Sequence, residues 1–135
     1  MKLLTLVLLL GVVLWVEGER QEIRVRGRLL CGGAPAGSTQ LKLVDEDRGP
    51  NPDDFLDSGY TNDEGYFELS GSENEASTID PVLKVYTDCD DGILLCQRKW
   101  RLTVPDSYVN SGRTFNFGVL NLETRMKDED RDCIH

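Results

Sequence analysis

Histidine is nearly absent from this sequence: the one histidine is His135, the last residue given. Gly-x-Ser-x-Gly, His-Glu-x-x-His and phosphate-loop patterns are also missing, and these mark common catalytic and nucleotide-binding sites. Two acidic pairs, Asp53-Asp54 and Asp90-Asp91, fall in predicted loops, where solvated carboxylates rather than a catalytic pair are the simplest interpretation. We therefore predict that the protein is not an enzyme and needs no cofactor.

Basic residues are in deficit. The chain has 15 Lys and Arg against 24 Asp and Glu, a formal net charge of -9. Proteins that bind nucleic acid present a basic footprint to the phosphate backbone. The charge balance therefore excludes a general nucleic-acid-binding protein.

Long apolar runs are missing after residue 15. The one such run, residues 3–15, follows Lys2 and precedes the small-residue site Val16-Glu17-Gly18, which is typical of a cleaved secretory signal peptide. The run is too short to be a convincing membrane span. We expect residues 1–18 to be the signal, 19–126 one domain and 127–135 an acidic tail tied by Cys133. The mature protein is then extracellular and has no transmembrane segment.

The sequence also lacks a Cys-x-x-Cys pair, which, with so little histidine, disfavours a zinc site. Its four cysteines are an even number, as in disulfide-linked secreted domains. We predict two disulfides, and four cysteines allow three connectivities. The cysteines are Cys31, Cys89, Cys96 and Cys133.

Apolar residues recur with the period of two that is typical of half-buried strands. In 23–29 they alternate with arginines, and the pattern returns in 40–43 and 99–104. Short extended runs are predicted at 55–61, 66–69, 82–86 and 114–125, and Gly118 predicts a bulge in the last of these. Segments 71–77 and 105–112 are predicted loops, the former with room for one helical turn, and 127–132 a mobile tail. Seven to eight short strands without helical periodicity indicate an all-β sandwich.

Many of the basic residues lie on strands, out of phase with the apolar residues, so their side chains are predicted to face solvent. They form two candidate sets for binding anionic lipid. The first is Lys42, Lys84, Lys99 and Arg101, and the second is Arg24, Arg26 and Arg28. A solvated sheet face, as most exposed strands have, is the alternative interpretation.

Acidic residues cluster around the loop between Cys89 and Cys96. Asp88, Asp90 and Asp91 supply the hard oxygen ligands that calcium prefers. They lack the spacing of an EF-hand, and an acidic turn held by disulfides is the alternative.

Segments in order along the chain resemble one family. They are VRGRLLCGGAPA, KLVDED, GPNPDD, GYTNDEGYFELSGS, IDPVLKVYTDCDDG, CQRKWRLTVPDSYV and NFGVLNLETR. Together they resemble the nematode transthyretin-like family. The resemblance implies a secreted, disulfide-stabilised β-sandwich of the transthyretin (prealbumin) type.

The resemblance also implies a role. The best-defined function associated with the family is to bridge phosphatidylserine on an apoptotic cell to a phagocyte receptor, as a non-enzymatic adaptor. A carrier of a small apolar ligand is the alternative, and the sequence is compatible with a homodimer. A purine-pathway hydrolase shares the fold, but its histidines and terminal Tyr-Arg-Gly-Ser are missing here.

The prealbumin arrangement adds two spatial expectations. It makes neighbours of the strands that carry Lys42, Lys84, Lys99 and Arg101, so these side chains are expected to form one exposed basic patch. It also gathers the four cysteines at one end of the sandwich. The favoured pairing is Cys31–Cys96 with Cys89–Cys133, and the local pair Cys89–Cys96 stays open.

Overall fold

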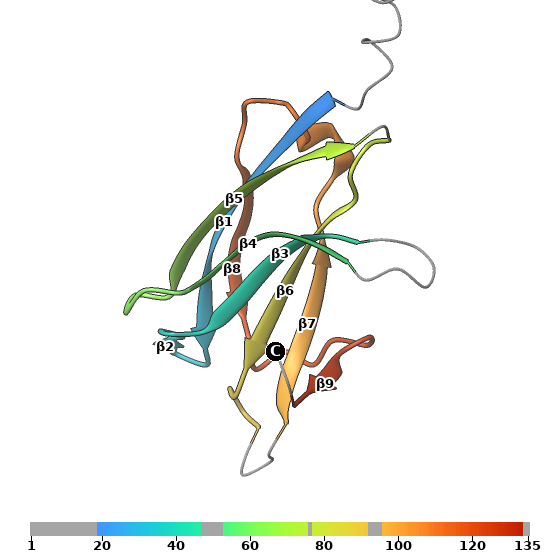
Figure 1. The fold of residues 1–135 in the computed structure, drawn as a ribbon. Helices are drawn as coiled ribbons and strands as arrows, with labels where there is room; N and C mark the ends of the chain where they lie inside the picture. The colour runs from blue at the N-terminus through green and yellow to red at the C-terminus, as the bar shows by residue number, and fades with distance from the viewer. Residues whose placement is uncertain (1–18, 47–52, 76, 92–95, 134–135) are drawn as a thin grey trace, which may run out of the picture.

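The computed structural model describes residues 19–46, 53–75, 77–91 and 96–133, which form a two-layer β-sandwich (Figure 1). The strands are β1 Glu19–Cys31, β2 Ala34–Pro35, β3 Gln40–Asp45, β4 Asp54–Tyr60, β5 Tyr66–Glu75, β6 Pro81–Thr87, β7 Gln97–Thr103, β8 Phe115–Asn121 and β9 Asp130–Asp132, with a short 3-10 helix at Asp106–Tyr108. Within this part of the chain, no helix has the length and apolar character needed to cross a membrane. The predicted signal peptide lies outside the described residues.

Two sheets make the layers. In the first, β1 pairs antiparallel with β2 and β5 and parallel with β8. The second runs in the order β4-β3-β6-β7-β9, with antiparallel pairing throughout. The predicted all-β sandwich is confirmed, and the described residues hold nine strands because β2 and β9 add short pairs to those predicted.

The predicted bulge at Gly118 is present. The β1–β8 register shifts between Arg26, opposite Asn116, and Arg28, opposite Val119. Gly118 itself has φ +75°, a conformation that glycine adopts without steric cost. The extra residue distorts the outer surface of this sheet beside β1.

The core lies between the sheets and follows the predicted alternation. Val25 and Leu29 on β1 are fully buried, as are Leu41 and Leu43 on β3. Trp100 on β7 is 2% exposed and packs in the same cluster. Successive strand side chains alternate between faces, so burying these residues sets which side of each strand faces solvent.

Two predicted irregular segments are strands. Residues 71–75, predicted as loop, continue β5, which pairs with β1 along ten residues from Tyr66 to Glu75. The tail, predicted to be mobile, contributes β9, which pairs with β7. Polar composition misled both predictions, because strand pairing satisfies backbone groups whatever the side chains are.

Both disulfides lie at one end of the sandwich, as predicted, but they join Cys31 to Cys89 and Cys96 to Cys133. The favoured pairing was wrong, and so was the local alternative. The reason is the register of the tail: Gln97 lies opposite Asp132, which places the next residues, Cys96 and Cys133, side by side. Cys89, just after β6, then meets the end of β1.

Arg98 is a fully buried charge that was not among the predicted site residues. It lies in phase with Trp100, and its guanidinium donates to both carboxylate oxygens of Glu129, at 2.5 and 2.9 Å. Further donors reach the backbone oxygens of Cys89, Leu122 and Thr124. The indole of Trp100 also donates to Glu129, at 2.9 Å.

The pKa of Glu129 is lowered from 4.5 to about 2, first by the hydrogen bond from Arg98 and then by that from Trp100, against the effect of burial. A lowered folded-state pKa stabilises the fold above the unfolded pKa, and this stability is lost as pH falls from about 4.5 to 2. We expect Glu129→Gln to lower the free energy of unfolding by about 3 kcal/mol at pH 7, because it leaves the buried guanidinium of Arg98 without its counterion. The difference from wild type should shrink towards pH 2, measured by denaturant unfolding.

Asp128→Asn is the matched control, since the neighbouring Asp128 is exposed. It should stay within about 0.5 kcal/mol of wild type. A loss at pH 7 that is as large for Asp128→Asn, or a Glu129→Gln loss that persists unchanged at pH 2, would contradict this account.

Candidate functional site

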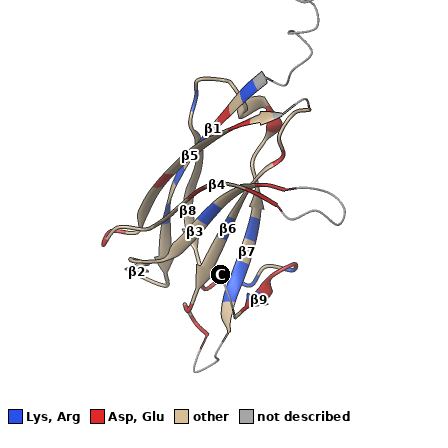
Figure 2. Cartoon of the chain, viewed as in Figure 1, with Lys and Arg blue, Asp and Glu red and all other residues tan. Residues whose placement is uncertain are grey.

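Four basic side chains lie on the outer face of the five-stranded sheet. Lys42 on β3 is opposite Lys84 on β6, which is opposite Arg101 on β7. Lys99 lies two residues before Arg101, on the same side of β7. Figure 2 shows Lys and Arg positions in blue along β3, β6 and β7. We call these four residues the basic row.

Acidic side chains neutralise most of the basic row. Lys84 pairs with Asp53 at 2.8 Å, Lys99 with Asp132 at 3.9 Å and Arg101 with Glu46. The side chain of Lys84 is only 16% exposed. Burial raises the pKa of Tyr86 beside the row, and the carboxylates of Asp132 and Asp53 raise it further. The row therefore differs from the free, exposed basic patch that the sequence predicted.

The other basic set, Arg24, Arg26 and Arg28, faces outward from β1 in the opposite sheet. Arg24 and Arg26 are exposed, and neither forms an ion pair with another described residue. Arg28 is held more closely: its Nε donates to the backbone oxygen of Glu64 at 2.8 Å, and its guanidinium lies 4.9 Å from the centre of the Tyr66 ring. We call these three residues the arginine face.

A hollow of about 450 Å³ opens on this face beside the bulge. Arg26 and Arg28 line it together with Tyr66 and Val119, residues that are 52% and 62% exposed. Glu68, which lies opposite Arg26 on β5, adds a carboxylate to the wall. The hollow thus combines two guanidinium groups and one carboxylate with an apolar rim.

The three calcium candidates have protein partners. Arg125 donates to the side chain of Asp90 at 3.2 Å, and Arg131 donates to that of Asp91. The Gln97 amide donates to Asp88 at 3.1 Å. Two of the three carboxylates thus bind arginine, which disfavours a cation at this loop.

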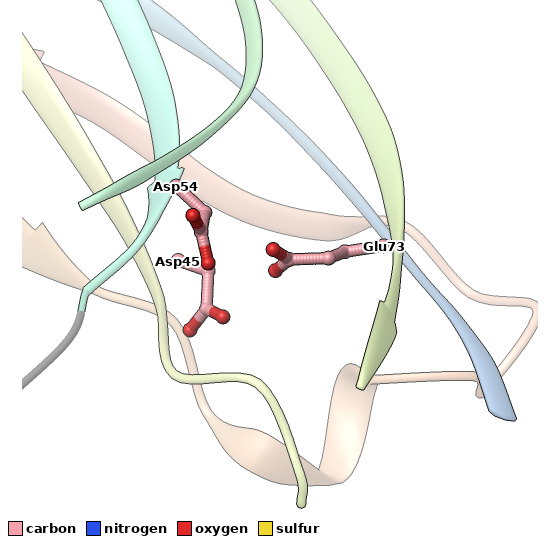
Figure 3. A group of neighbouring side chains, drawn as sticks. All are labelled: Asp45, Asp54 and Glu73. Atoms are coloured by element: carbon pink, nitrogen blue, oxygen red, sulfur yellow. The ribbon is translucent and has the colours of Figure 1, made fainter. Parts of the chain in front are cut away.

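A different acidic cluster was missed. Asp45, Asp54 and Glu73 come together from β3, β4 and β5 (Figure 3), with a carboxylate oxygen of each within 4.8 Å of the others. A signal for it was present: Asp45 is in phase with Leu41 and Leu43 on β3. Glu73 is likewise in phase with the buried residues of β5, so both carboxylates face inward.

Gly71 lets β5 approach β4 closely beside this cluster. A Cβ on Gly71 would lie 2.8 Å from both the Cβ and the backbone oxygen of Leu56. The side chain of Asp57 also accepts a hydrogen bond from the backbone of Ser70 at 3.0 Å. Glu73, two residues along on the same face as Gly71, is therefore held near the two aspartates.

These features define a class: a two-layer, disulfide-linked β-sandwich whose polar surfaces suit binding. Comparison with known proteins identifies the family. Residues 26–105 match the model of the Transthyretin-like family. The chain belongs to this family, which is generally one of non-enzymatic binding proteins.

Its relatives include several proteins of Caenorhabditis elegans. The chain is 45% identical to Transthyretin-like protein 5, over the full length of both. It is 50% identical to Transthyretin-like protein 46, over 84% of this chain and 66% of the relative. Among solved structures, a 9R-lipoxygenase from Cyanothece aligns with a TM-score of 0.44 and 24% identity, over 75% of this chain and 16% of that one, too weak a likeness to carry an argument.

The close approach at Gly71 can be tested directly. We expect Gly71→Ala to lower the free energy of unfolding by about 2 kcal/mol, because the added methyl overlaps backbone atoms that cannot move aside. The matched control is Gly33→Ala, where an added Cβ meets nothing within 4 Å. Denaturant unfolding of the two variants should differ clearly, and equal stability would contradict the close contact between β4 and β5.

Proposed function

We propose that this protein is a secreted adaptor that binds phosphatidylserine exposed on apoptotic cells and presents it to a phagocyte receptor. The observation that carries the lipid half is the arginine face. Arg24 and Arg26 are exposed and unpaired among the described residues, whereas most of the basic row is neutralised. Guanidinium groups bind phosphate and carboxylate oxygens in a forked geometry, and the phosphatidylserine headgroup carries both groups.

The net charge of -9 does not oppose this role. At physiological salt, charges farther apart than about 8 Å are largely screened, so attraction to a membrane depends on the local surface. Tyr66 and Val119 beside the arginines supply an amphipathic and an apolar contact of the kind that suits the membrane interface. The two disulfides fit an oxidising compartment outside the cell.

The receptor half is assigned to the opposite sheet. Phe55 and Tyr60 on β4 are 64% and 66% exposed, and β4 is an edge strand. Exposed aromatic residues are frequent anchors of protein interfaces. Membrane and receptor would then contact different sheets of one sandwich, which is what a bridging protein needs.

Vesicle co-sedimentation tests the lipid half. We expect the purified mature protein to bind vesicles that contain phosphatidylserine and to ignore pure phosphatidylcholine. Arg24→Glu/Arg26→Glu should weaken binding about 30-fold or more, since each cation near an anionic membrane contributes about 1 kcal/mol. Binding should fall further as salt rises.

The control is Lys42→Glu/Lys99→Glu, which changes the net charge equally but on the basic row. It should retain most of the vesicle binding. An equal loss in both double variants would remove the arginine face from the mechanism, and a wild type indifferent to phosphatidylserine would overturn the lipid half.

A carrier of a small apolar ligand is the second candidate, and the hollow beside Val119 favours it. Its volume of about 450 Å³ exceeds the roughly 300 Å³ that small-ligand sites need. The two arginines in its wall would suit an amphiphilic anion better than a neutral hydrocarbon. Fluorescence of the neutral probe Nile red, enhanced by wild type and reduced in Val119→Ser, would support the carrier over the adaptor.

A further inference from the structure

We propose that Asp45, Asp54 and Glu73 bind a calcium ion between the two sheets. Asp45 and Asp54 are cross-strand neighbours in one sheet, and Glu73 reaches them from the other (Figure 3). Like charges directly opposite each other on paired strands are destabilising, and a third carboxylate adds to the repulsion. A cation at the centre would turn this repulsion into attraction.

The burial of Asp45 points independently to a missing ligand. Its residue is 2% exposed. One carboxylate oxygen, Oδ1, accepts a hydrogen bond from the backbone of Asp80 at 2.8 Å. The other, Oδ2, is buried without a hydrogen-bond partner among the described residues. A buried, ionised oxygen is costly unless a donor or a metal ion compensates it, and no ion pair between described residues includes Asp45 or Asp54.

The donor set selects the kind of ion. All three ligands are carboxylates, and hard oxygen donors without histidine or cysteine suit calcium or magnesium rather than zinc. Calcium–oxygen distances are about 2.3–2.6 Å, so ligands on opposite sides of one ion lie about 5 Å apart, in keeping with oxygens within 4.8 Å. Calcium also tolerates irregular and bidentate carboxylate geometry better than magnesium does. We therefore assign calcium, with water completing its shell.

The position of the proposed calcium ion predicts that it stabilises the fold. β3 and β4 belong to one sheet and β5 to the other, so the ion would join the two layers beside the close contact at Gly71. A ligand that binds only the folded state stabilises that state by mass action. Calcium should therefore raise the unfolding temperature of the mature protein without changing its fold.

Thermal unfolding and isothermal titration calorimetry with CaCl2 test the site. Protein stripped with EGTA should bind one calcium, and its Tm should rise by about 10 °C when calcium is roughly 100 times the Kd. MgCl2 should give a clearly smaller shift, and a shift at least as large would overturn the choice of calcium. Absence of any heat of binding and of any Tm shift would overturn the site.

Three conservative variants locate the ion: Asp45→Asn, Asp54→Asn and Glu73→Gln. Each should abolish or strongly weaken the calcium response. In EGTA, Asp45→Asn should be at least as stable as wild type, because it removes one of the repelling charges. Three variants keep the test valid if one of them fails to fold.

Two controls separate this site from other acidic positions. Glu68→Gln changes an exposed residue on the outer face of the same strand as Glu73, and Asp90→Asn changes the acidic loop singled out from the sequence. Both should keep the full calcium response. If Asp90→Asn loses the response while Asp45→Asn keeps it, the ion binds at the loop and the proposal is wrong.

Discussion

The buried guanidinium of Arg98 joins three parts of the chain that lie far apart in the sequence. It binds the backbone at Cys89 and Leu122 and the carboxylate of Glu129 in the tail. Burying such a charge is unfavourable unless every donor finds an acceptor, so the tail must return to β7 for the sheet to be stable. That return places Cys133 beside Cys96, and the pairing of both disulfides follows from it.

The period-two pattern was enough to predict the sandwich and the outward side of each strand. Leu41, Lys42 and Leu43 illustrate why: burying the leucines forces the lysine outward. The same pattern did not predict the state of the basic row. Asp53, Glu46 and Asp132 neutralise it from distant segments, and strand periodicity says nothing about which loop or tail residues reach a sheet face.

The acidic cluster of Asp45, Asp54 and Glu73 was not predicted, although its signal was local. Asp45 and Glu73 continue the alternation of their strands on the side that faces the core. The strand pattern predicted over 40–43 stops short of Asp45, and the loop predicted over 71–77 includes Glu73, because charged residues are typical of the ends of strands. An acidic residue at an inward-facing strand position instead indicates a buried carboxylate with a partner, because burying an unpaired charge is unfavourable.

The parallel pairing of β1 with β8 constrains how the protein is made. Val25 aligns with Phe115, so β1, the central strand of the first sheet, cannot complete its pairing until β8 has been synthesised. Such non-local pairing closes a large loop and slows folding relative to helices or hairpins. Until β8 is synthesised, one edge of β1 therefore has no strand partner. Cys89 and Cys96 both precede Cys133 in the chain, so at that stage Cys31 has more than one cysteine with which it could form a disulfide.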